Sequence, residues 1–345
     1  MFHTEMSPHA RKWRKHLLLA TLTTCVAGAF LGGAIHTIWL AKGRVQQMRD
    51  HSTYDAKSSK EVANHVQAAG EFFDATTRND NVSTYTVARA ESLLRDDLWK
   101  RLAQRVSVPA GPFIMGTDSP VSDVQDRPRH MASTGAFAID KFPITNAQYA
   151  MFTSETAHKA PSTWKDGLIP KGFELNPVVM VTWQDASDYC TWSGQRLPTE
   201  AEWEKAARGT DGRRWPWGNK MNPKLLNTYN TRGTTTPVFA HMAGASPYGA
   251  VDMAGNVAEW TKNNFKPYKG SQAPTSMFFV DQSHSKYGAS EQYKPIRGGS
   301  WKSDPFSTST YHRSYAFNGD ASDFIGFRCV SSEKNKGVNT RAQHK

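Results

Sequence analysis

Residues that could carry out metal, redox or acyl-transfer chemistry are few in this chain and are far apart. Its three cysteines are Cys25, Cys190 and Cys329. The sequence contains neither a phosphate-binding loop nor a G-x-S-x-G nucleophile elbow, so nucleotide hydrolysis and serine-hydrolase chemistry are not expected. Five histidines lack the spacing of metal ligands: they are His130, His158, His241, His284 and His312.

Four short segments in a fixed order are the most informative feature of the sequence. They read RLPTEAEWEKAAR at 196–208, GNVAEW at 255–260, RGGSW at 297–301 and GFRC at 326–329. Together they resemble the sulfatase-modifying-factor family, whose best-known member is the formylglycine-generating enzyme. The resemblance covers roughly residues 105–332. It implies an α+β domain with a C-type-lectin-like fold and little regular secondary structure.

The resemblance does not include the copper ligands of the formylglycine-generating enzyme. That enzyme binds copper(I) through two cysteines, three and eight positions after the serine of RGGS, and soft thiolates suit copper(I). Counted from Ser300, these positions hold Ser303 and Thr308, whose hydroxyls are poor ligands for copper(I). A tryptophan of the family motif GNVWEW is also replaced, by Ala258. Copper and copper-dependent formylglycine formation are therefore not expected.

The resemblance implies that a groove nevertheless persists beside the RGGSW turn. The alternative is that the same residues are structural, with two glycines in a tight turn and Arg313 paired with an acid. The expected lining residues are Ser300, Trp301, Ser303, Thr308, Tyr311, His312 and Arg313.

A calcium site is a further implication of the resemblance, in the segment DMAGNVAE. The ligands carried over are the side chains of Asp252 and Glu259 and the carbonyls of Gly255 and Val257. Calcium takes six to eight oxygen ligands, so this set completed by water is sufficient. The alternative is that Glu259 bonds neighbouring backbone N–H groups and holds the loop without metal.

Two other metal sites of related proteins have weaker support. A second calcium site of the family would begin at Asn227 and the carbonyl of Thr228, but its later half is shortened between residues 232 and 237. A related ergothioneine-pathway group keeps iron in a separate helical domain with three histidines. The corresponding region here has only His51 and His65, so that chemistry is unsupported.

The resemblance also implies a disulfide between Cys190 and Cys329, because cysteines at the matching positions are bonded in the formylglycine-generating enzyme. Closing a loop of about 140 residues would restrict the unfolded chain by on the order of 4–5 kcal/mol in the chain-entropy model. Two buried free thiols are the alternative, and a location outside the cytoplasm favours the bridge.

Residues 17–41 form an almost uncharged apolar stretch. As a helix, its 25 residues would span about 37 Å, enough to cross a bilayer. Four basic residues precede it, so the N-terminus is expected in the cytoplasm and the rest outside, in the periplasm or extracellular space. Cleavage near Ala27-Gly28-Ala29 and lipidation at Cys25 are the alternatives to a single-pass inner-membrane anchor.

The formal net charge of +11 is concentrated at the two ends of the chain. Residues 1–44 carry six basic residues against Glu5, and residues 331–345 carry four against Glu333, which leaves +3 for residues 45–330. A membrane flank and a solvated tail account for this distribution, and nucleic-acid binding is not expected.

These observations predict five parts of the chain. A basic cytoplasmic segment (1–16) and the anchor (17–41) precede a helical stalk (42–106), the sulfatase-modifying-factor-like domain (107–332) and a basic tail (333–345). In the stalk, helical runs are expected at 58–75 and 87–105, because the apolar residues of the second lie near helical spacing.

Within the domain, capping boxes predict three helix starts. The sequence 108–116 reads as strand, turn and strand, and short strands are expected after Gly209. Gly194 should end the second helix, and Glu204 should pair with Arg208 one turn later in the third. The boxes are Thr145 with Gln148, Thr182 with Asp185, and Thr199 with Glu202.

Two classes of function fit this sequence. The first is an accessory or maturation factor acting outside the cytoplasm on a protein, peptide or small-molecule client. It includes non-copper oxidoreductases, because family relatives occur in siderophore maturation and beside nitrite reductases. The second is a non-catalytic, lectin-like binding or scaffold module. The missing copper ligands favour the second class or a non-copper version of the first.

Overall fold

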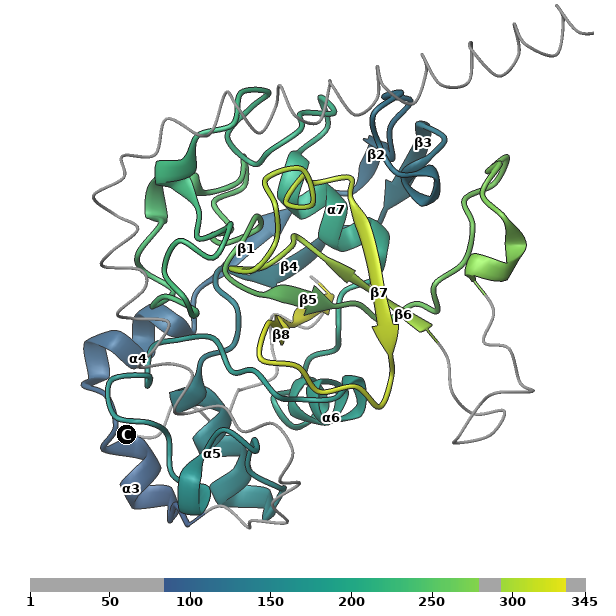
Figure 1. Ribbon diagram of the computed structural model, residues 1–345. Helices are drawn as coiled ribbons and strands as arrows, with labels where there is room; N and C mark the ends of the chain where they lie inside the picture. Colours follow the sequence, from purple (N-terminus) through teal and green to yellow (C-terminus); the bar gives the residue numbers. More distant parts are fainter. Residues whose placement is uncertain (1–83, 279–292, 333–345) are drawn as a thin grey trace, which may run out of the picture. The chain divides into compact units, whose positions relative to one another are not determined.

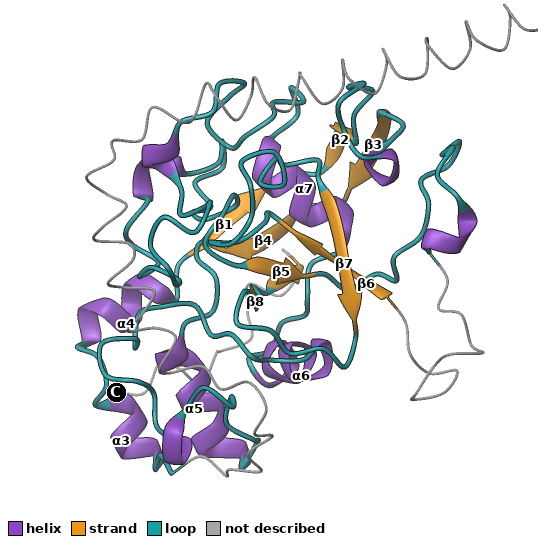
Figure 2. Ribbon diagram, in the orientation of Figure 1, coloured by secondary structure: helices purple, strands orange, loops and turns teal. Residues whose placement is uncertain are grey.

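A computed structural model describes residues 84–278 and 293–332 of the chain. The expected anchor at 17–41, the first helical run of the stalk and the tail at 333–345 lie outside these residues. Across 84–278 and 293–332, no helix is long and apolar enough to cross a membrane. The described residues combine short helices with small sheets joined by long loops (Figures 1 and 2).

Within the described residues, nine strands form three small sheets. The first has the order β1–β4–β9 and the second pairs β2 with β3, all antiparallel. The third has the order β7–β6–β5–β8, in which β5 and β8 run parallel. The strands are β1 (Arg105–Val108), β2 (Gly111–Met115), β3 (His130–Thr134), β4 (Phe137–Asp140), β5 (Ala258–Trp260), β6 (Tyr293–Arg297), β7 (Arg313–Phe317), β8 (Ile325–Gly326) and β9 (Val330–Ser332).

The strand–turn–strand expectation for 108–116 is confirmed, but the two strands do not pair with each other. β1 pairs with β4, and β2 pairs with β3. Sequence alone could not assign these partners, since pairing depends on contacts made far along the chain. After residue 209 the chain contains the expected run of short strands, from β5 to β9.

The three capped helices form as predicted, and each capping box makes both of its hydrogen bonds. They are α5 (Asn146–Thr156), α6 (Trp183–Trp192) and α7 (Glu200–Arg208). Gly194 follows the end of α6 with φ of 72°. In Figure 1, α5 and α6 lie below β4, β5 and β8, and α7 lies between these strands and the β2–β3 pair.

The predicted stalk ends earlier than residue 106. In place of one helix over 87–105, the chain forms α3 (Val87–Glu91) and α4 (Asp96–Leu102). Ala90 and Leu102 are buried, and the ring of Tyr85 lies 6.1 Å from that of Trp164. Residues 84–104 are therefore part of the folded domain, because their apolar side chains find partners in its core rather than along a free helix.

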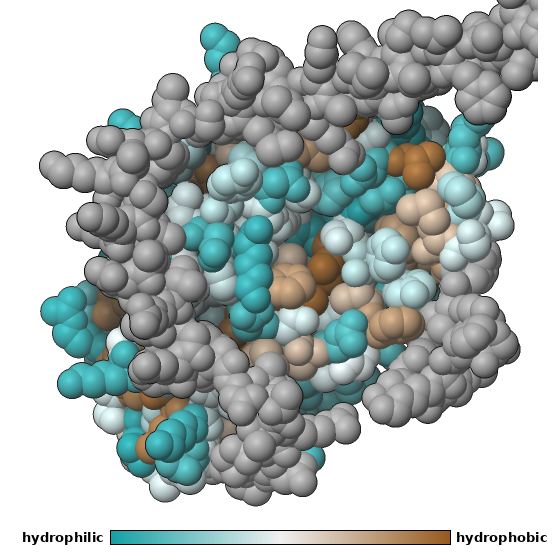
Figure 3. All heavy atoms as spheres, viewed as in Figure 1, coloured by the Kyte–Doolittle hydropathy of each residue, from teal (hydrophilic) through white to brown (hydrophobic). Residues whose placement is uncertain are grey.

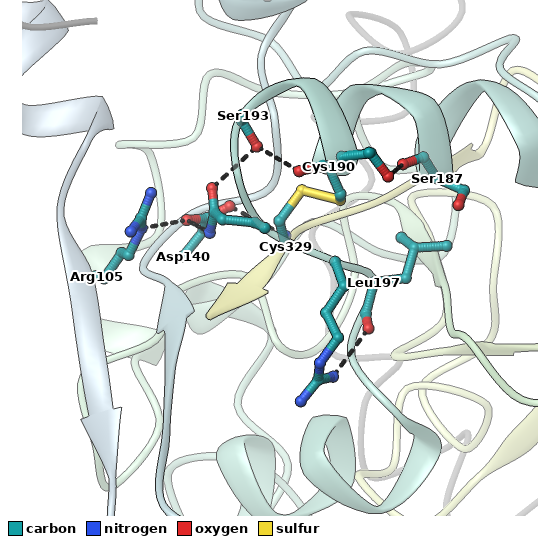
Figure 4. The surroundings of a disulfide bond; sticks show 10 residues. Arg105, Asp140, Ser187, Cys190, Ser193, Leu197 and Cys329 are labelled. Atoms are coloured by element: carbon teal, nitrogen blue, oxygen red, sulfur yellow. Dashed lines mark hydrogen bonds and ion pairs between the residues drawn. A yellow bond between two sulfur atoms is a disulfide. The ribbon is translucent and has the colours of Figure 1, made fainter. Parts of the chain in front are cut away.

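Cys190 of α6 and Cys329, between β8 and β9, form the disulfide that the family resemblance implies (Figure 4). Their Cα atoms lie 5.6 Å apart. Both residues are buried beside Asp140, which accepts a hydrogen bond from the Cys329 N–H at 3.0 Å. The bridge ties α6 to the last strands of the domain.

The four sequence motifs meet in one buried network. The motif GNVAEW contains β5. In β5, Glu259 is opposite Arg297, the first residue of RGGSW at the end of β6. On its other side, Glu259 is opposite Gly326, the first residue of GFRC at the end of β8. The Arg297 guanidinium donates to Glu200 and Glu204 of α7 at 2.7 and 2.6 Å. The Arg328 guanidinium donates to both oxygens of Glu259 at 2.7 Å.

These buried ion pairs give the charged residues of the motifs a structural role, so no catalytic role is needed to explain them. The expected Glu204–Arg208 pair also forms, at 2.7 Å, and both side chains are buried. Removing one partner of a buried ion pair leaves an uncompensated charge, at a cost of about 3–5 kcal/mol. The motifs therefore hold α7 against the third sheet and fix the loop that follows β6.

Candidate functional site

The RGGSW turn directs the chain from β6 into the loop that would carry the copper ligands. Gly298 and Gly299 have φ of 89° and 64°, in the left-handed region that favours glycine. A Cβ on Gly298 would lie 3.0 Å from the Trp203 ring, and one on Gly299 would lie 2.8 Å from the Ser307 carbonyl. These two positions therefore require glycine for both conformation and space.

The hydroxyls at the two copper-ligand positions are engaged in local hydrogen bonds. Ser303 Oγ accepts a hydrogen bond from the Ser300 N–H at 2.9 Å. Thr308 is fully buried; its hydroxyl donates to the Pro305 carbonyl at 2.7 Å and accepts from the Trp215 indole N–H at 3.2 Å. Both side chains thus stabilise the loop itself.

Most of the expected groove residues are buried rather than lining an open surface. Ser300, Trp301, Thr308, Tyr311, His312 and Arg313 are all at most 7% exposed, and Ser303 is partly exposed. The Arg313 guanidinium pairs with Glu200, as the structural alternative expected. Figure 3 shows hydrophobic side chains near the middle of one face, with hydrophilic ones to their left and a mixture of both kinds to their right.

Tyr229 is the exposed aromatic residue next to this loop, and the sequence did not single it out. It is 56% exposed, and its N–H donates to the Ser303 carbonyl at 2.8 Å. The following N–H, of Asn230, donates to the Trp301 carbonyl at 2.6 Å. The signal in the sequence is weak, because an exposed tyrosine in a polar loop has no distinguishing pattern. Lys302, also exposed, lies in the turn between Trp301 and Ser303, whose carbonyls accept these two hydrogen bonds.

His312 lies against two aspartates that the sequence analysis did not connect with it. Its Nδ1 is 3.3 Å from Asp126 Oδ2 and 3.8 Å from Asp123 Oδ2. Burial lowers the pKa of His312, but the hydrogen bond and charge of Asp126, together with Asp123, raise it above its usual value. The aspartates precede the histidine by more than 180 residues, so spacing could not reveal the cluster.

The expected calcium ligands have different surroundings. Asp252 is buried, and its Oδ2 accepts from the Asn256 amide at 2.8 Å, whereas its Oδ1 has no hydrogen-bond partner among the described residues. Burial raises the pKa of Asp252 to about 7. Glu259 accepts from Arg328 and from the Trp203 indole N–H at 2.8 Å, instead of the neighbouring backbone N–H groups that the metal-free alternative assumed.

These contacts leave room for a cation. A carboxylate has about four lone-pair positions, and Glu259 uses three of them. The unpartnered Asp252 Oδ1 is a buried acceptor of the kind that calcium satisfies. His241 Nδ1 lies 3.9 Å from this oxygen and also lacks a hydrogen-bond partner within the described residues. The residues present are thus compatible with calcium.

The residues proposed to begin a second calcium site form part of the same region. Asn227 is buried, and its carbonyl accepts from the Asn256 N–H at 2.8 Å. Its Oδ1 is another buried acceptor without a partner in the described part of the chain. The Thr228 hydroxyl donates to the Ser303 carbonyl at 2.7 Å, so Thr228 connects this segment with the RGGSW loop.

Comparison with known families is decisive for the fold. Residues 91–333 match the family described as "Sulfatase-modifying factor enzyme 1-like domain". The chain belongs to this family. The match begins within α3, in agreement with a domain that includes residues before 107.

Individual relatives of this sulfatase-modifying-factor chain differ in their assigned activity. It is 34% identical over 236 residues to hercynine oxygenase of Mycolicibacterium smegmatis, covering 58% of this chain and 54% of that protein. It is 31% identical over 289 residues to the inactive C-alpha-formylglycine-generating enzyme 2 of Mus musculus, covering 66% and 85%. The chain thus spans about half the length of the first relative. The family includes both oxidases and inactive members.

A solved structure supports the same mixed helix and sheet fold. PvdO from Pseudomonas aeruginosa matches with a TM-score of 0.53 and 26% identity, covering 66% of this chain and 93% of PvdO. Treponema denticola variable protein 1 matches with a TM-score of 0.50 and 21% identity, which indicates a shared fold alone.

Proposed function

We propose that this protein is an accessory or maturation factor that binds a client and does not form formylglycine through copper. The single observation that carries this proposal is that Ser303 and Thr308 occupy the two copper-ligand positions. Their hydroxyls replace the two thiolates and are used in hydrogen bonds within the loop. Copper(I) favours soft sulfur ligands, so this loop lacks the donors that copper-dependent oxygen activation in the family requires.

The remaining cysteines do not restore such a site. Cys190 and Cys329 are bonded to each other, and Cys25 lies outside the described residues. The similarity to a mammalian relative named as inactive supports the same conclusion. The retained family fold, with its motif network intact, supports a binding role that needs no thiol.

The client surface is proposed to include Tyr229 and Lys302, which are exposed beside the RGGSW loop. Trp301 is buried next to this surface, and the Lys302 ammonium lies 4.7 Å from the centre of its ring. An exposed aromatic ring beside a turn whose lysine pairs with Asp323 at 2.6 and 2.7 Å suits a peptide or small-molecule client.

The absence of copper chemistry is tested by incubating the purified protein with copper(I), oxygen and a peptide carrying the sulfatase Cys-x-Pro-x-Arg motif. We expect the peptide mass to remain unchanged. An aldehyde product that depends on this protein would overturn this part of the proposal.

The client surface is tested by site-specific crosslinking in the host cell. Tyr229→Ala should reduce the yield of the crosslinked client at least several-fold. Met131→Ala is the matched control, because Met131 is also an exposed apolar residue, at 65%, but lies on β3. Equal yields from the two variants would refute a client surface at Tyr229.

Calcium and membrane anchoring complete the proposal. Calcium would be held by Asp252, Glu259 and the carbonyls of Gly255 and Val257, and it would stabilise this loop. The chain would be anchored by residues 17–41 in the inner membrane, with the domain outside the cytoplasm. An alkaline phosphatase fusion after residue 110 should then be active in the periplasm, and an inactive fusion would contradict this topology.

A non-copper oxidoreductase is the second candidate function. It is favoured by the cluster of His312 with Asp123 and Asp126, which offers one nitrogen and two oxygen donors. The similarity to a protein named hercynine oxygenase is in keeping with redox chemistry in the family. A lectin-like binding module without any reaction remains the alternative, and the metal content of the purified protein discriminates between them.

A further inference from the structure

We propose that His312, Asp123 and Asp126 form a site for a divalent first-row transition metal, such as Fe(II) or Mn(II). The ligand atoms are one imidazole nitrogen and two carboxylate oxygens. This site is separate from the calcium region at Asp252, and it does not depend on the proposed client-binding function.

The positions of the three donor atoms fit a common metal ion. All three lie within 4.8 Å of one another. His312 Nδ1 is 3.3 Å from Asp126 Oδ2 and 3.8 Å from Asp123 Oδ2. Nitrogen and oxygen ligands bind such metals at about 2.0–2.2 Å, so two donors on one ion can be no farther apart than about 4.4 Å. Small side-chain rotations bring the set to this distance.

The site is held by the backbone on both sides. Asp126 is the last residue of the 3-10 turn Val124–Asp126 and is fully buried. Its Oδ1 accepts from the Arg313 N–H at 2.8 Å, which leaves Oδ2 directed toward His312. His312 is buried at the end of the RGGSW loop, and its N–H donates to the Ser309 carbonyl at 2.9 Å.

The local charge favours a cation at this site. Two carboxylates face one imidazole, so the cluster keeps a net negative charge even when His312 is protonated. The neighbouring Arg313 guanidinium is bonded to both oxygens of Glu200, at 2.7 and 2.9 Å. Arg297 is likewise committed to Glu200 and Glu204. A divalent ion would replace the imidazole proton and neutralise both aspartates.

The ligand types and the solvent exposure of the site suit a metal ion that also binds water or a client group. One nitrogen and two carboxylates suit borderline and hard ions and exclude copper(I). Three protein ligands leave coordination positions open for water or a client group. The Asp123 side chain is 35% exposed, so the cluster reaches solvent. His312 follows Thr308 by four residues, so one of the three ligands comes from the segment just after the second copper-ligand position.

The test uses the full-length protein, freed of transition metals, in detergent micelles with calcium present throughout. Co(II) is titrated as a spectroscopic probe, and Mn(II) binding is followed by electron paramagnetic resonance. We expect one Co(II) per chain, with visible absorption bands and a histidine ligand. Asp123→Asn should weaken Co(II) binding at least tenfold, and His312→Gln should abolish the visible bands.

The controls separate metal binding from folding and from the calcium region. Asp123 is partly exposed, so Asp123→Asn should melt at the wild-type temperature. Asp304→Asn removes an exposed carboxylate from the same loop and should bind Co(II) as the wild type does. Asp252→Asn should also leave Co(II) binding unchanged. Absence of binding, or equal affinity in Asp123→Asn, would overturn the site, whereas client crosslinking at Tyr229 would be unaffected.

Discussion

At the scale of single residues, the charged residues of the motifs are structural. Arg297, Glu204 and Arg328 are fully buried, and each is paired with an opposite charge. Such pairs are retained because removing one partner is costly, even where the intact pair adds little stability. The residues that set this chain apart from the formylglycine-generating enzyme are the neutral hydroxyls of Ser303 and Thr308.

The disulfide leads to a prediction about stability. Cys190→Ala should lower the melting temperature of the oxidised domain, because the bridge closes a loop of 139 residues in sequence separation. The expected loss is on the order of 4 kcal/mol in the chain-entropy model. Thermal melting of the wild type with and without a reductant provides the comparison, and the reductant should have no further effect on the variant. A wild type that melts equally in both buffers would contradict the prediction.

The unpartnered oxygen of Asp252 leads to a second prediction. Calcium should raise the melting temperature of the wild type, and by mass action a concentration 100 times the dissociation constant would add about 2.7 kcal/mol. Asp252→Asn should lose this response, while Glu259 and its bonds to Arg328 and Trp203 remain. Magnesium is the control ion and should have little effect, since it demands a tighter octahedral site. A calcium response that survives Asp252→Asn would place the ion elsewhere.

At the scale of elements, α3 and α4 belong to the domain. Leu102 of α4 is 3% exposed and packs with Phe142, Val238 and Val251. The expectation of a stalk helix over 87–105 failed here because an apolar spacing shows that a helix has an apolar face, and does not show which surface covers it.

This packing predicts different effects for two neighbours in α4. Leu102→Ala should destabilise the domain by about 2–5 kcal/mol, the usual cost of removing a buried leucine side chain. Lys100→Ala, at an exposed position of the same helix, should change the free energy of unfolding by less than about 0.5 kcal/mol. Denaturant unfolding of both variants measures the difference. Equal stability would mean that 84–104 is a free stalk after all.

At the scale of the whole domain, stability should depend on pH through its buried carboxylates. Burial alone would raise the pKa of Glu200, but the charges of Arg313 and Arg297 lower it below the usual value. Asp185 and Glu202 are also lowered, through His158 and Arg196 respectively. A depressed pKa means that the stabilisation is complete above the unfolded-state value and is lost as pH falls through the folded-state value.

We therefore expect the free energy of unfolding to decrease steeply as pH is lowered below about 4. Glu200→Gln should cost about 3–5 kcal/mol at neutral pH, because Arg313 loses its partner, and should flatten the acid slope. Asp140 and Asp252 act in the opposite sense, because burial raises their pKa values. Urea titrations of the variant and the wild type at several pH values measure the contribution of Glu200. If the free energy of unfolding fell equally steeply with pH in both proteins, the proposed role of Glu200 would be contradicted.

The sequence by itself determined the family, the three capped helices, the disulfide partners and the loss of the copper thiolates. These features depend on local hydrogen bonds or on motif residues at recognisable positions. Only the tertiary structure decided that 84–104 joins the core, that the expected groove residues are buried, and that Tyr229 is exposed beside Ser303. It also brought Asp123 and Asp126 to His312. Each of these results depends on contacts between segments far apart in the chain, which pack according to shape and burial rather than spacing.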